Sequence, residues 1–192
     1  MNRILVASFL GFLAVAALVA GGVRWWVGPP DAREAAKAAL QAPPQWTPVD
    51  WPFLNDQFGK GKAFECAAKE CGADIRLTFR AKIGFCDCAR GVADDEELER
   101  IGDLHMIGEK YIALDDGHPV AVGHMKGRGR PYSFDAGDHN VFVLSVAFND
   151  RCDVIVATAQ SRQATPDDFQ KPVMDFLTSA YVLRWAELTL GL

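Results

Sequence analysis

The sequence predicts an α+β domain in which helices pack on one face of an antiparallel sheet, preceded by a single N-terminal transmembrane or signal helix. Three observations lead to this fold class. The chain of 192 residues begins with an uncharged apolar segment, its middle has short segments in which apolar and polar residues alternate, and its end has apolar residues at helical spacing. Strands in succession, with helices between and after them, favour an antiparallel sheet.

The first apolar segment is predicted to be a membrane anchor. Ile4 to Val23 contains no charged residue, and about 20 apolar residues span the hydrocarbon core of a bilayer. Trp25 and Trp26 follow directly, as suits the membrane interface. A cleaved signal peptide ending at Ala20-Gly21-Gly22 is the alternative, but the apolar part of a signal is usually about 7–15 residues long. The expected partner of residues 4–23 is therefore the lipid bilayer.

A proline-rich stalk follows the anchor. Six of the ten prolines lie between Val27 and Pro52, and proline makes a linker semi-rigid. The segment DAREAAKAAL within it predicts a short helix that Asp31 caps. The predicted organisation of the chain is an anchor or signal at 1–26, a stalk at 27–52 and a periplasmic α+β domain at 53–192.

Alternation of apolar and polar residues predicts the strands of the domain. Ile75, Leu77 and Phe79 alternate with polar residues, and Ile83 and Phe85 continue the same parity. This pattern is typical of a strand, or two short strands, with one face in water. Weaker strand patterns cover 111–114, 120–124 and 132–134, and the two strongest cover 141–148 and 152–158, which Asn149-Asp150 would join as a tight hairpin.

Capping residues and helical spacing predict two helices. Asp94 and Glu97 form a capping box at the start of a helix over 94–104. Val173, Phe176 and Leu177 follow the i, i+3, i+4 spacing of a C-terminal helix that runs to about residue 188. A start signal at 165–168 precedes this helix, and Pro172 predicts a break before its main part.

Charge and motifs exclude several classes of function. The net charge is −5, with 25 acidic and 20 basic residues, and an acidic body would repel the phosphates of a nucleic acid. We therefore expect no nucleic-acid partner. The sequence has no G-x-S-x-G, H-E-x-x-H or phosphate-loop motif. It supports no enzyme assignment and no catalytic residue, and no cofactor is expected.

The five cysteines allow three interpretations. Cys66, Cys71, Cys86 and Cys88 are spaced C-x4-C-x14-C-x-C, and Cys152 lies far along the chain. Disulfides persist in oxidising compartments, so this interpretation agrees with a periplasmic body. Four thiolates can also hold zinc, although structural zinc sites usually have two C-x2–4-C pairs. A redox centre is the third interpretation, but the C-x-x-C motif is absent.

If disulfides form, the spacing favours one arrangement among the fifteen that five cysteines allow for two bridges. Cys86 and Cys88 would share a face of a strand, so each would seek a partner elsewhere. The nearest candidates are Cys66 and Cys71, and we expect two nested bridges between these pairs. Cys152 would then be free and buried at the start of its strand, because a free thiol packs as a small apolar group.

Two His-Met pairs and one basic segment are further candidate sites. In the periplasm, His, Met and Cys together could bind copper as soft ligands, although a role of the methionines as core residues is favoured. The candidate metal ligands are Cys86, Cys88, His105, Met106, His124 and Met125. Lys126, Arg128 and Arg130 are separated by glycines and predict a surface loop that contacts lipid head groups or an acidic partner. A solvated hairpin tip explains the same residues.

The segments WPFLNDQFGKGKAF, IGFCDC, AFNDRCD and LRWAELTLGL resemble a group of functionally unassigned, membrane-anchored bacterial proteins. The resemblance covers most of the body after Trp51. It implies a bacterial envelope protein and brings no activity, cofactor or catalytic residue. The order of elements is also similar to the PsbP/Mog1-like α+β fold, and a fold does not establish a function.

The leading hypothesis is a non-enzymatic accessory or interaction protein of the bacterial inner membrane. The anchor would hold a disulfide-stapled body in the periplasm, where it binds another envelope protein. The alternative is a thiol-redox or zinc- or copper-handling protein that uses Cys86 and Cys88. A hydrolase without a recognisable signature is a third hypothesis.

Overall fold

The computed structural model describes residues 42–43 and 45–192. The predicted anchor at 4–23 and most of the predicted stalk lie outside these residues. Among the helices that the structure does describe, none has both the length and the apolar character needed to cross a membrane.

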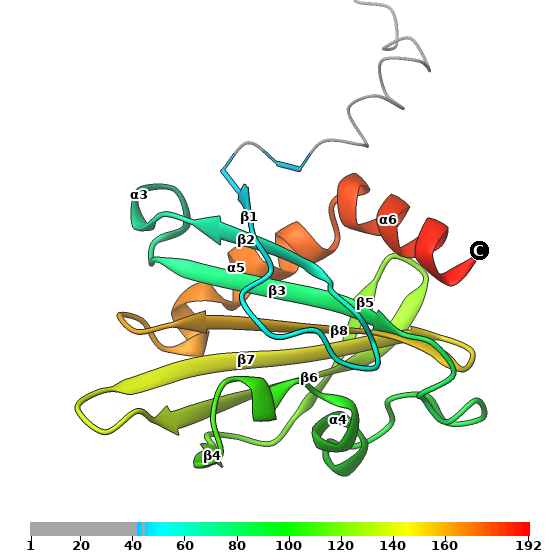
Figure 1. Cartoon of the computed structure of the whole chain (residues 1–192), viewed down its shortest axis with the longest axis horizontal. Coiled ribbons are helices and arrows are strands. Elements are labelled where there is room, and N and C mark those ends of the chain that lie inside the picture. Colours follow the sequence, from blue (N-terminus) through cyan, green and yellow to red (C-terminus); the bar gives the residue numbers. More distant parts are fainter. Residues whose placement is uncertain (1–41, 44) are drawn as a thin grey trace, which may run out of the picture. The chain divides into compact units, whose positions relative to one another are not determined.

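The described part of the chain is built around one eight-stranded antiparallel sheet (Figure 1). Its strands are β1 (Thr47–Val49), β2 (Lys62–Cys66), β3 (Ile75–Lys82), β4 (Tyr111–Ala113), β5 (His118–Val122), β6 (Met125–Asp135), β7 (Asn140–Asp150) and β8 (Asp153–Ser161). The strand order is β1-β2-β3-β8-β7-β6-β4, and β5 also pairs with β6. Every strand pair is antiparallel, which confirms the α+β class.

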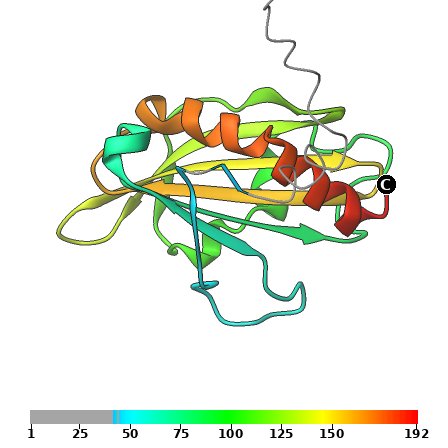
Figure 2. The same ribbon diagram turned by 90° about the horizontal axis from the view of Figure 1, so that it is seen from above.

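Helices cover both faces of the sheet. They are α3 (Ala68–Cys71), α4 (Asp95–Ile101), α5 (Pro166–Leu177) and α6 (Ala180–Leu190), with a short 3-10 turn η1 (Leu104–Met106). Helices α5 and α6 lie on one face and α4 on the other (Figures 1 and 2). The prediction of helices on one face is therefore wrong. Strands β7 and β8 are apolar on both faces, and each face has to be covered.

The larger core lies between the sheet and helices α5 and α6. Ile75, Leu77 and Phe79 of β3 point into it, as their alternation predicts, and they pack with buried residues of both helices. Trp46 also belongs to this core, where its ring centre lies 4.7 Å from that of Phe176. With β1 paired to β2, the folded body includes residues 46–52, which the sequence assigns to the stalk.

Local capping signals place the helix boundaries. The Asp94 carboxylate accepts a hydrogen bond from the Glu97 N–H at 2.9 Å, as predicted for the start of α4. Pro172 lies inside α5, so the predicted break at this residue is wrong. The break comes at Thr178 and Ser179, between α5 and α6, and the Ser179 side chain caps α6.

The hairpin between β7 and β8 turns two residues later than the sequence predicts. Asn149 and Asp150 still belong to β7, where Asn149 pairs with Val154. The turn is formed by Arg151 and Cys152, and Arg151 has a positive φ of 54°. The Asn149 side chain accepts from the Val92 N–H and donates to the Arg151 carbonyl. Asn149 therefore fixes neighbouring loops, and Cys152 lies in the turn.

Candidate functional site

Two disulfides are present, but their pairing differs from the predicted one. They join Cys66 to Cys71 and Cys88 to Cys152, and Cys86 is a buried free thiol. Strand β3 separates the cysteines that were expected to pair, because Cys66 pairs with its first residue whereas Cys86 and Cys88 follow its last. A strand of eight residues spans roughly 26 Å, which no disulfide bridges.

The turn of the β7–β8 hairpin lies at the far end of β3, because Lys82 pairs with Val154. This places Cys152 beside the segment that follows β3, and the Cys86 N–H donates to the Cys152 carbonyl at 3.2 Å. The segment after β3 forms turns rather than a strand. The assumption that Cys86 and Cys88 share one strand face is therefore wrong, and so is the expectation that Cys152 is the free thiol.

Cys86 lacks the properties of a reactive thiol. Its side chain is buried, and this burial raises its pKa to about 11. Reactive cysteines have lowered pKa values and some exposure. Because Cys88 is bonded to Cys152, Cys86 and Cys88 do not form a dithiol in this structure.

We expect maleimide to leave the native, unreduced protein unmodified and to add one label per chain after unfolding in urea. With a pKa of about 11, only about 0.1% of the Cys86 thiol is ionised at pH 8. Intact-mass spectrometry measures the number of labels. Unfolded and reduced protein, which should take five labels, is the control. Rapid labelling of the native protein would contradict the assignment of Cys86 as an inert core thiol.

The structure does not bring the candidate metal ligands together. His105 lies in η1 on the α4 face of the sheet, next to buried Leu104. Met125 lies in the core under α5 and α6, on the opposite face, and His124 is exposed in the turn before it. Within residues 42–43 and 45–192, no group of three or more His, Cys, Asp and Glu side chains is arranged to hold a metal ion.

The basic segment from Lys126 to Arg130 is part of β6 rather than a loop. Arg128 forms an ion pair with Asp95 of α4, and Arg130 pairs with Glu99 of α4 at 2.8 Å. Gly127, between Lys126 and Arg128, packs closely, because a Cβ there would lie 1.9 Å from the Ala147 carbonyl oxygen. The two arginines thus hold α4 on the sheet, whereas Lys126 is exposed. Contact of this segment with a partner stays a prediction.

A buried ionic cluster lies between β3 and α4. Arg80 donates to both carboxylate oxygens of Asp103, at 2.8 and 2.6 Å. Lys82 contacts the same carboxylate at 2.9 Å and donates to the Ile101 carbonyl at 2.6 Å. These three charged residues are at most 4% exposed. Asp56, which is partly exposed, pairs with Arg80 at 2.7 Å.

The cluster connects three segments that are distant in the sequence. Arg80 and Lys82 come from β3, Asp103 from the connection between α4 and η1, and Asp56 from the loop before β2. Burial lowers the pKa of Lys82, and the Asp103 carboxylate opposes this effect. A hydrogen bond from Arg80 lowers the pKa of Asp56. The sequence places Arg80 on a face expected to be in water, and only the packing of α4 and the loop buries it.

An aromatic surface lies directly above this cluster. Two adjoining hollows of about 360 and 400 Å³ share the rings of Phe58 and Phe85, whose centres are 4.8 Å apart. The Lys82 ammonium lies 4.7 Å from the Phe58 ring centre, and the Arg100 guanidinium 5.0 Å from that of Phe85. Ile83 lines one hollow and is 61% exposed. We call Phe58, Ile83, Phe85 and Arg100 the Phe58–Phe85 surface.

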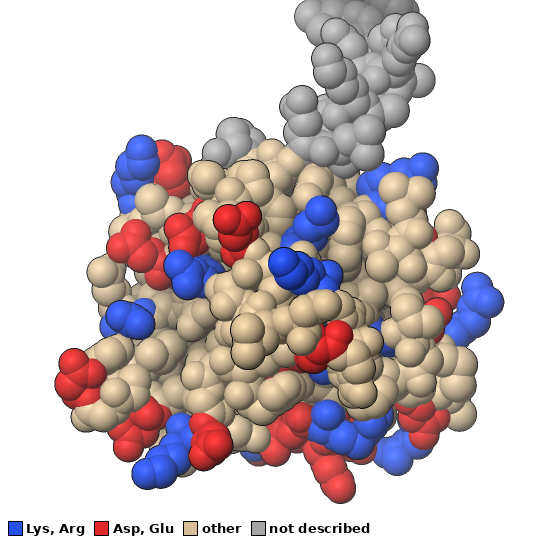
Figure 3. Space-filling model, viewed as in Figure 1, with Lys and Arg blue, Asp and Glu red and all other residues tan. Residues whose placement is uncertain are grey.

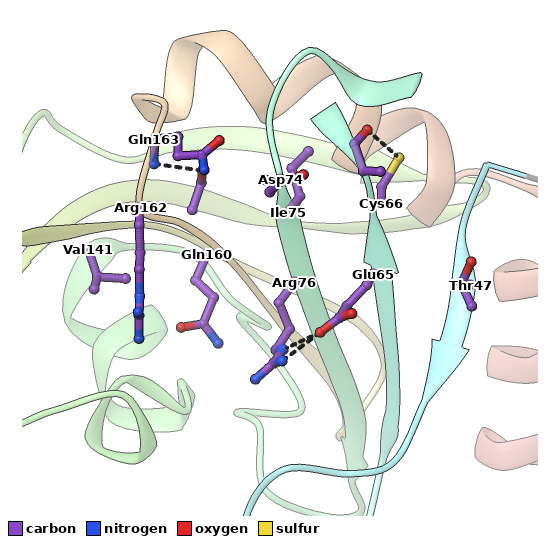
Figure 4. A pocket seen from close by; sticks show the side chains of 12 residues that line it. Thr47, Glu65, Cys66, Asp74, Ile75, Arg76, Val141, Gln160, Arg162 and Gln163 are labelled. Atoms are coloured by element: carbon purple, nitrogen blue, oxygen red, sulfur yellow. Dashed lines mark hydrogen bonds and ion pairs between the residues drawn. The ribbon is translucent and has the colours of Figure 1, made fainter. Parts of the chain in front are cut away.

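A larger groove, of about 600 Å³, lies at the other end of β3 (Figure 4). Glu65, Arg76 and Gln160 line it side by side, because their strands β2, β3 and β8 pair in this register. Arg76 donates to one oxygen of Glu65 at 2.9 and 2.5 Å. Figure 4 shows Arg162 extended beside Gln160, and within the described chain it has no ion-pair or side-chain hydrogen-bond partner.

Acidic and basic side chains are interspersed over the α4 face of the molecule (Figure 3). Several of them form pairs at or near the surface, such as Arg76 with Glu65 and Arg100 with Glu97. On the face that Figure 3 shows, no broad patch has a single sign of charge. Specific contacts on this face therefore depend on individual side chains rather than on an extended field.

Comparison with known proteins shows similarity of structure only. No protein-family model and no curated protein matches the chain. Solved structures that are similar include PA94, a protein of unknown function from Pseudomonas aeruginosa, with 11% identity over 70% of this chain and 94% of that one, at a TM-score of 0.44. LpqN, involved in cell envelope biogenesis of Mycobacterium tuberculosis, has 12% identity over 73% and 78%, at 0.42.

The Ran-binding protein Mog1p of Saccharomyces cerevisiae is also similar, with 10% identity over 77% of this chain and 82% of that one, at a TM-score of 0.43. TM-scores below 0.5 carry no inference about what this chain binds or where it resides.

Proposed function

We propose that this protein is a membrane-anchored accessory protein of the bacterial envelope that binds another envelope protein through the Phe58–Phe85 surface. The observation that carries the proposal is the exposure of Ile83 next to two half-buried aromatic rings and an arginine. Aromatic residues and arginine are enriched at protein interfaces, and residues of these types contribute most to binding.

The buried ionic cluster supports this proposal because it makes the surface rigid. The Lys82 ammonium group packs against the rings of Phe58 and Phe85 on their buried side. Asp103 and the Ile101 carbonyl hold this ammonium group in place. The Arg80 guanidinium lies 5.3 Å from the Phe58 ring centre. Its ion pair with Asp56 fixes the loop to which Phe58 belongs. A surface held in its binding conformation loses little entropy when a partner docks.

The two disulfides support a location outside the cytoplasm. Cys66–Cys71 and Cys88–Cys152 are stable in oxidising compartments such as the periplasm. In the proposed arrangement, the apolar segment at 4–23 tethers the body to the inner membrane and the proline-rich stalk separates the two.

Replacing Ile83 by aspartate is expected to remove the envelope partner without unfolding the protein. Ile83 is 61% exposed, so the charge remains in water in the free protein but would be buried at an interface. Proteins retained after mild detergent extraction are quantified by mass spectrometry, and the partner should decrease at least tenfold. Leu188→Asp on α6 is a matched control, because Leu188 is 62% exposed. Identical sets of retained proteins for both variants and the parent would contradict the proposal.

A further inference from the structure

The groove shown in Figure 4 has no role in the proposed function, and both acidic and basic side chains line it. It lies at the start of β3, whereas the Phe58–Phe85 surface lies at the end of this strand. We propose that this groove binds a short peptide by its two charged ends, the carboxylate beside Arg162 and Gln160 and the ammonium group beside Glu65.

The charges of the groove favour a ligand that carries both signs. Arg76 and Arg162 are its cations and Glu65 and Asp74 its acids, so its formal charge is zero. Arg76 is already paired with Glu65 through one oxygen of that carboxylate. This leaves the second Glu65 oxygen for an ammonium group, and Arg162 as the cation without an ion-pair partner in the described part of the chain. A doubly charged phosphate would meet one available cation and two nearby carboxylates. A single carboxylate with an ammonium group at some distance matches the arrangement better.

The spacing of the strands sets the length of the ligand. Glu65 on β2 and Gln160 on β8 lie on either side of Arg76 on β3, and two strand spacings amount to about 10 Å. An extended chain advances about 3.4 Å per residue, so three residues cover this distance. The groove volume of about 600 Å³ lies within the range of about 300–1,000 Å³ for sites that take small organic ligands.

The groove is preorganised by contacts within the protein itself. Three adjacent strands form its floor, and the Cys66–Cys71 disulfide closes the loop at its rim. The Asp74 carboxylate accepts from the Ala68 N–H at 2.8 Å, which orients it within that loop. Figure 4 shows the amide of Gln160 between the guanidinium groups of Arg162 and Arg76, so an amide donor lies next to the charge of Arg162.

The test titrates the ¹⁵N-labelled full chain in detergent micelles with trialanine and follows backbone amide shifts. We expect shifts at residues 76, 160 and 162, and an affinity that falls at least tenfold for trialanine with an amidated C-terminus. N-acetylated trialanine should also bind more weakly, because Glu65 loses the ammonium group. In the Arg162→Gln variant the acid and the amide should bind with equal affinity, since the partner of the carboxylate is gone. Arg184→Gln on α6, which changes an exposed arginine far from the groove, should bind trialanine as the parent does.

Three results would overturn the proposal. The first is the absence of shifts in the groove at up to about 10 mM trialanine, a concentration that detects Kd values in the millimolar range. The second is equal affinity of the parent protein for the free and the amidated peptide. The third is an Arg162→Gln variant that still prefers the free carboxylate. Arg162 is exposed, so its replacement leaves the core intact, and unchanged spectra away from the groove would verify this.

Discussion

Replacing Asp103 by asparagine is expected to lower the free energy of unfolding by about 3–5 kcal/mol, the range for removing one partner from a buried ion pair. Asp103 is 4% exposed and contacts both Arg80 and Lys82. Asparagine keeps the shape of the side chain but removes the charge, which leaves two buried cations with only the partly exposed carboxylate of Asp56. Urea denaturation followed by circular dichroism measures the loss.

A matched control for this prediction is Glu65→Gln, which breaks the pair with Arg76 at the surface. Both side chains of that pair are almost half exposed, so water screens the charges and the loss should stay below about 1 kcal/mol. Equal losses for Asp103→Asn and Glu65→Gln would contradict the role of the buried cluster.

The loss in the Asp103→Asn variant should also depend on pH. Burial lowers the pKa of Lys82 below its ordinary value of 10.5, and Asp103 opposes this effect, so its removal lowers the folded-state pKa further. A lysine whose pKa is lower in the folded than in the unfolded state binds fewer protons when folded. Stability then rises with pH between the two pKa values. The difference in stability between the parent and Asp103→Asn should therefore shrink from pH 7 towards pH 10.

Removing the Cys88–Cys152 bridge by replacing both cysteines with alanine is expected to lower the free energy of unfolding by about 4 kcal/mol. Removing Cys66–Cys71 in the same way should lower it by about 2 kcal/mol. The two bridges join residues that are 64 and 5 positions apart. A longer loop restricts the unfolded chain more. Thermal and urea unfolding of the two double variants, each compared with the parent, measures both losses.

The control for the disulfide prediction is Cys86→Ala, which removes a free buried thiol and no bridge. The decrease in unfolding free energy of this variant reports only the packing of a small core side chain. It is expected to be smaller than the decrease for the Cys88–Cys152 double variant. Equal losses for the two bridges, or a larger loss for Cys66–Cys71, would show that the native-state geometry of these loops outweighs the restriction of the unfolded chain.

The sequence determined those features that depend on residues close together in the chain. The parity of Ile75, Leu77 and Phe79 identified the buried face of β3, and Asp94 identified the start of α4. Both signals act within a few residues, because a strand repeats every two residues and a cap acts over three. For the cysteines, the sequence favoured disulfides over a metal or redox site but did not decide among these three interpretations.

Only the tertiary structure decided which distant segments meet. Cys88 pairs with Cys152 because the β7–β8 turn reaches the end of β3, and this depends on strand register, which local patterns do not encode. Arg80 and Lys82 lie on the face of β3 that the alternation assigned to water. They are buried because α4 and the loop around Asp56 cover this face. In the same way, Glu65, Arg76 and Gln160 form one groove because three strands pair side by side. Such sites are created by long-range packing, because the free energy that brings these segments together is distributed over the whole sheet and its two layers of helices.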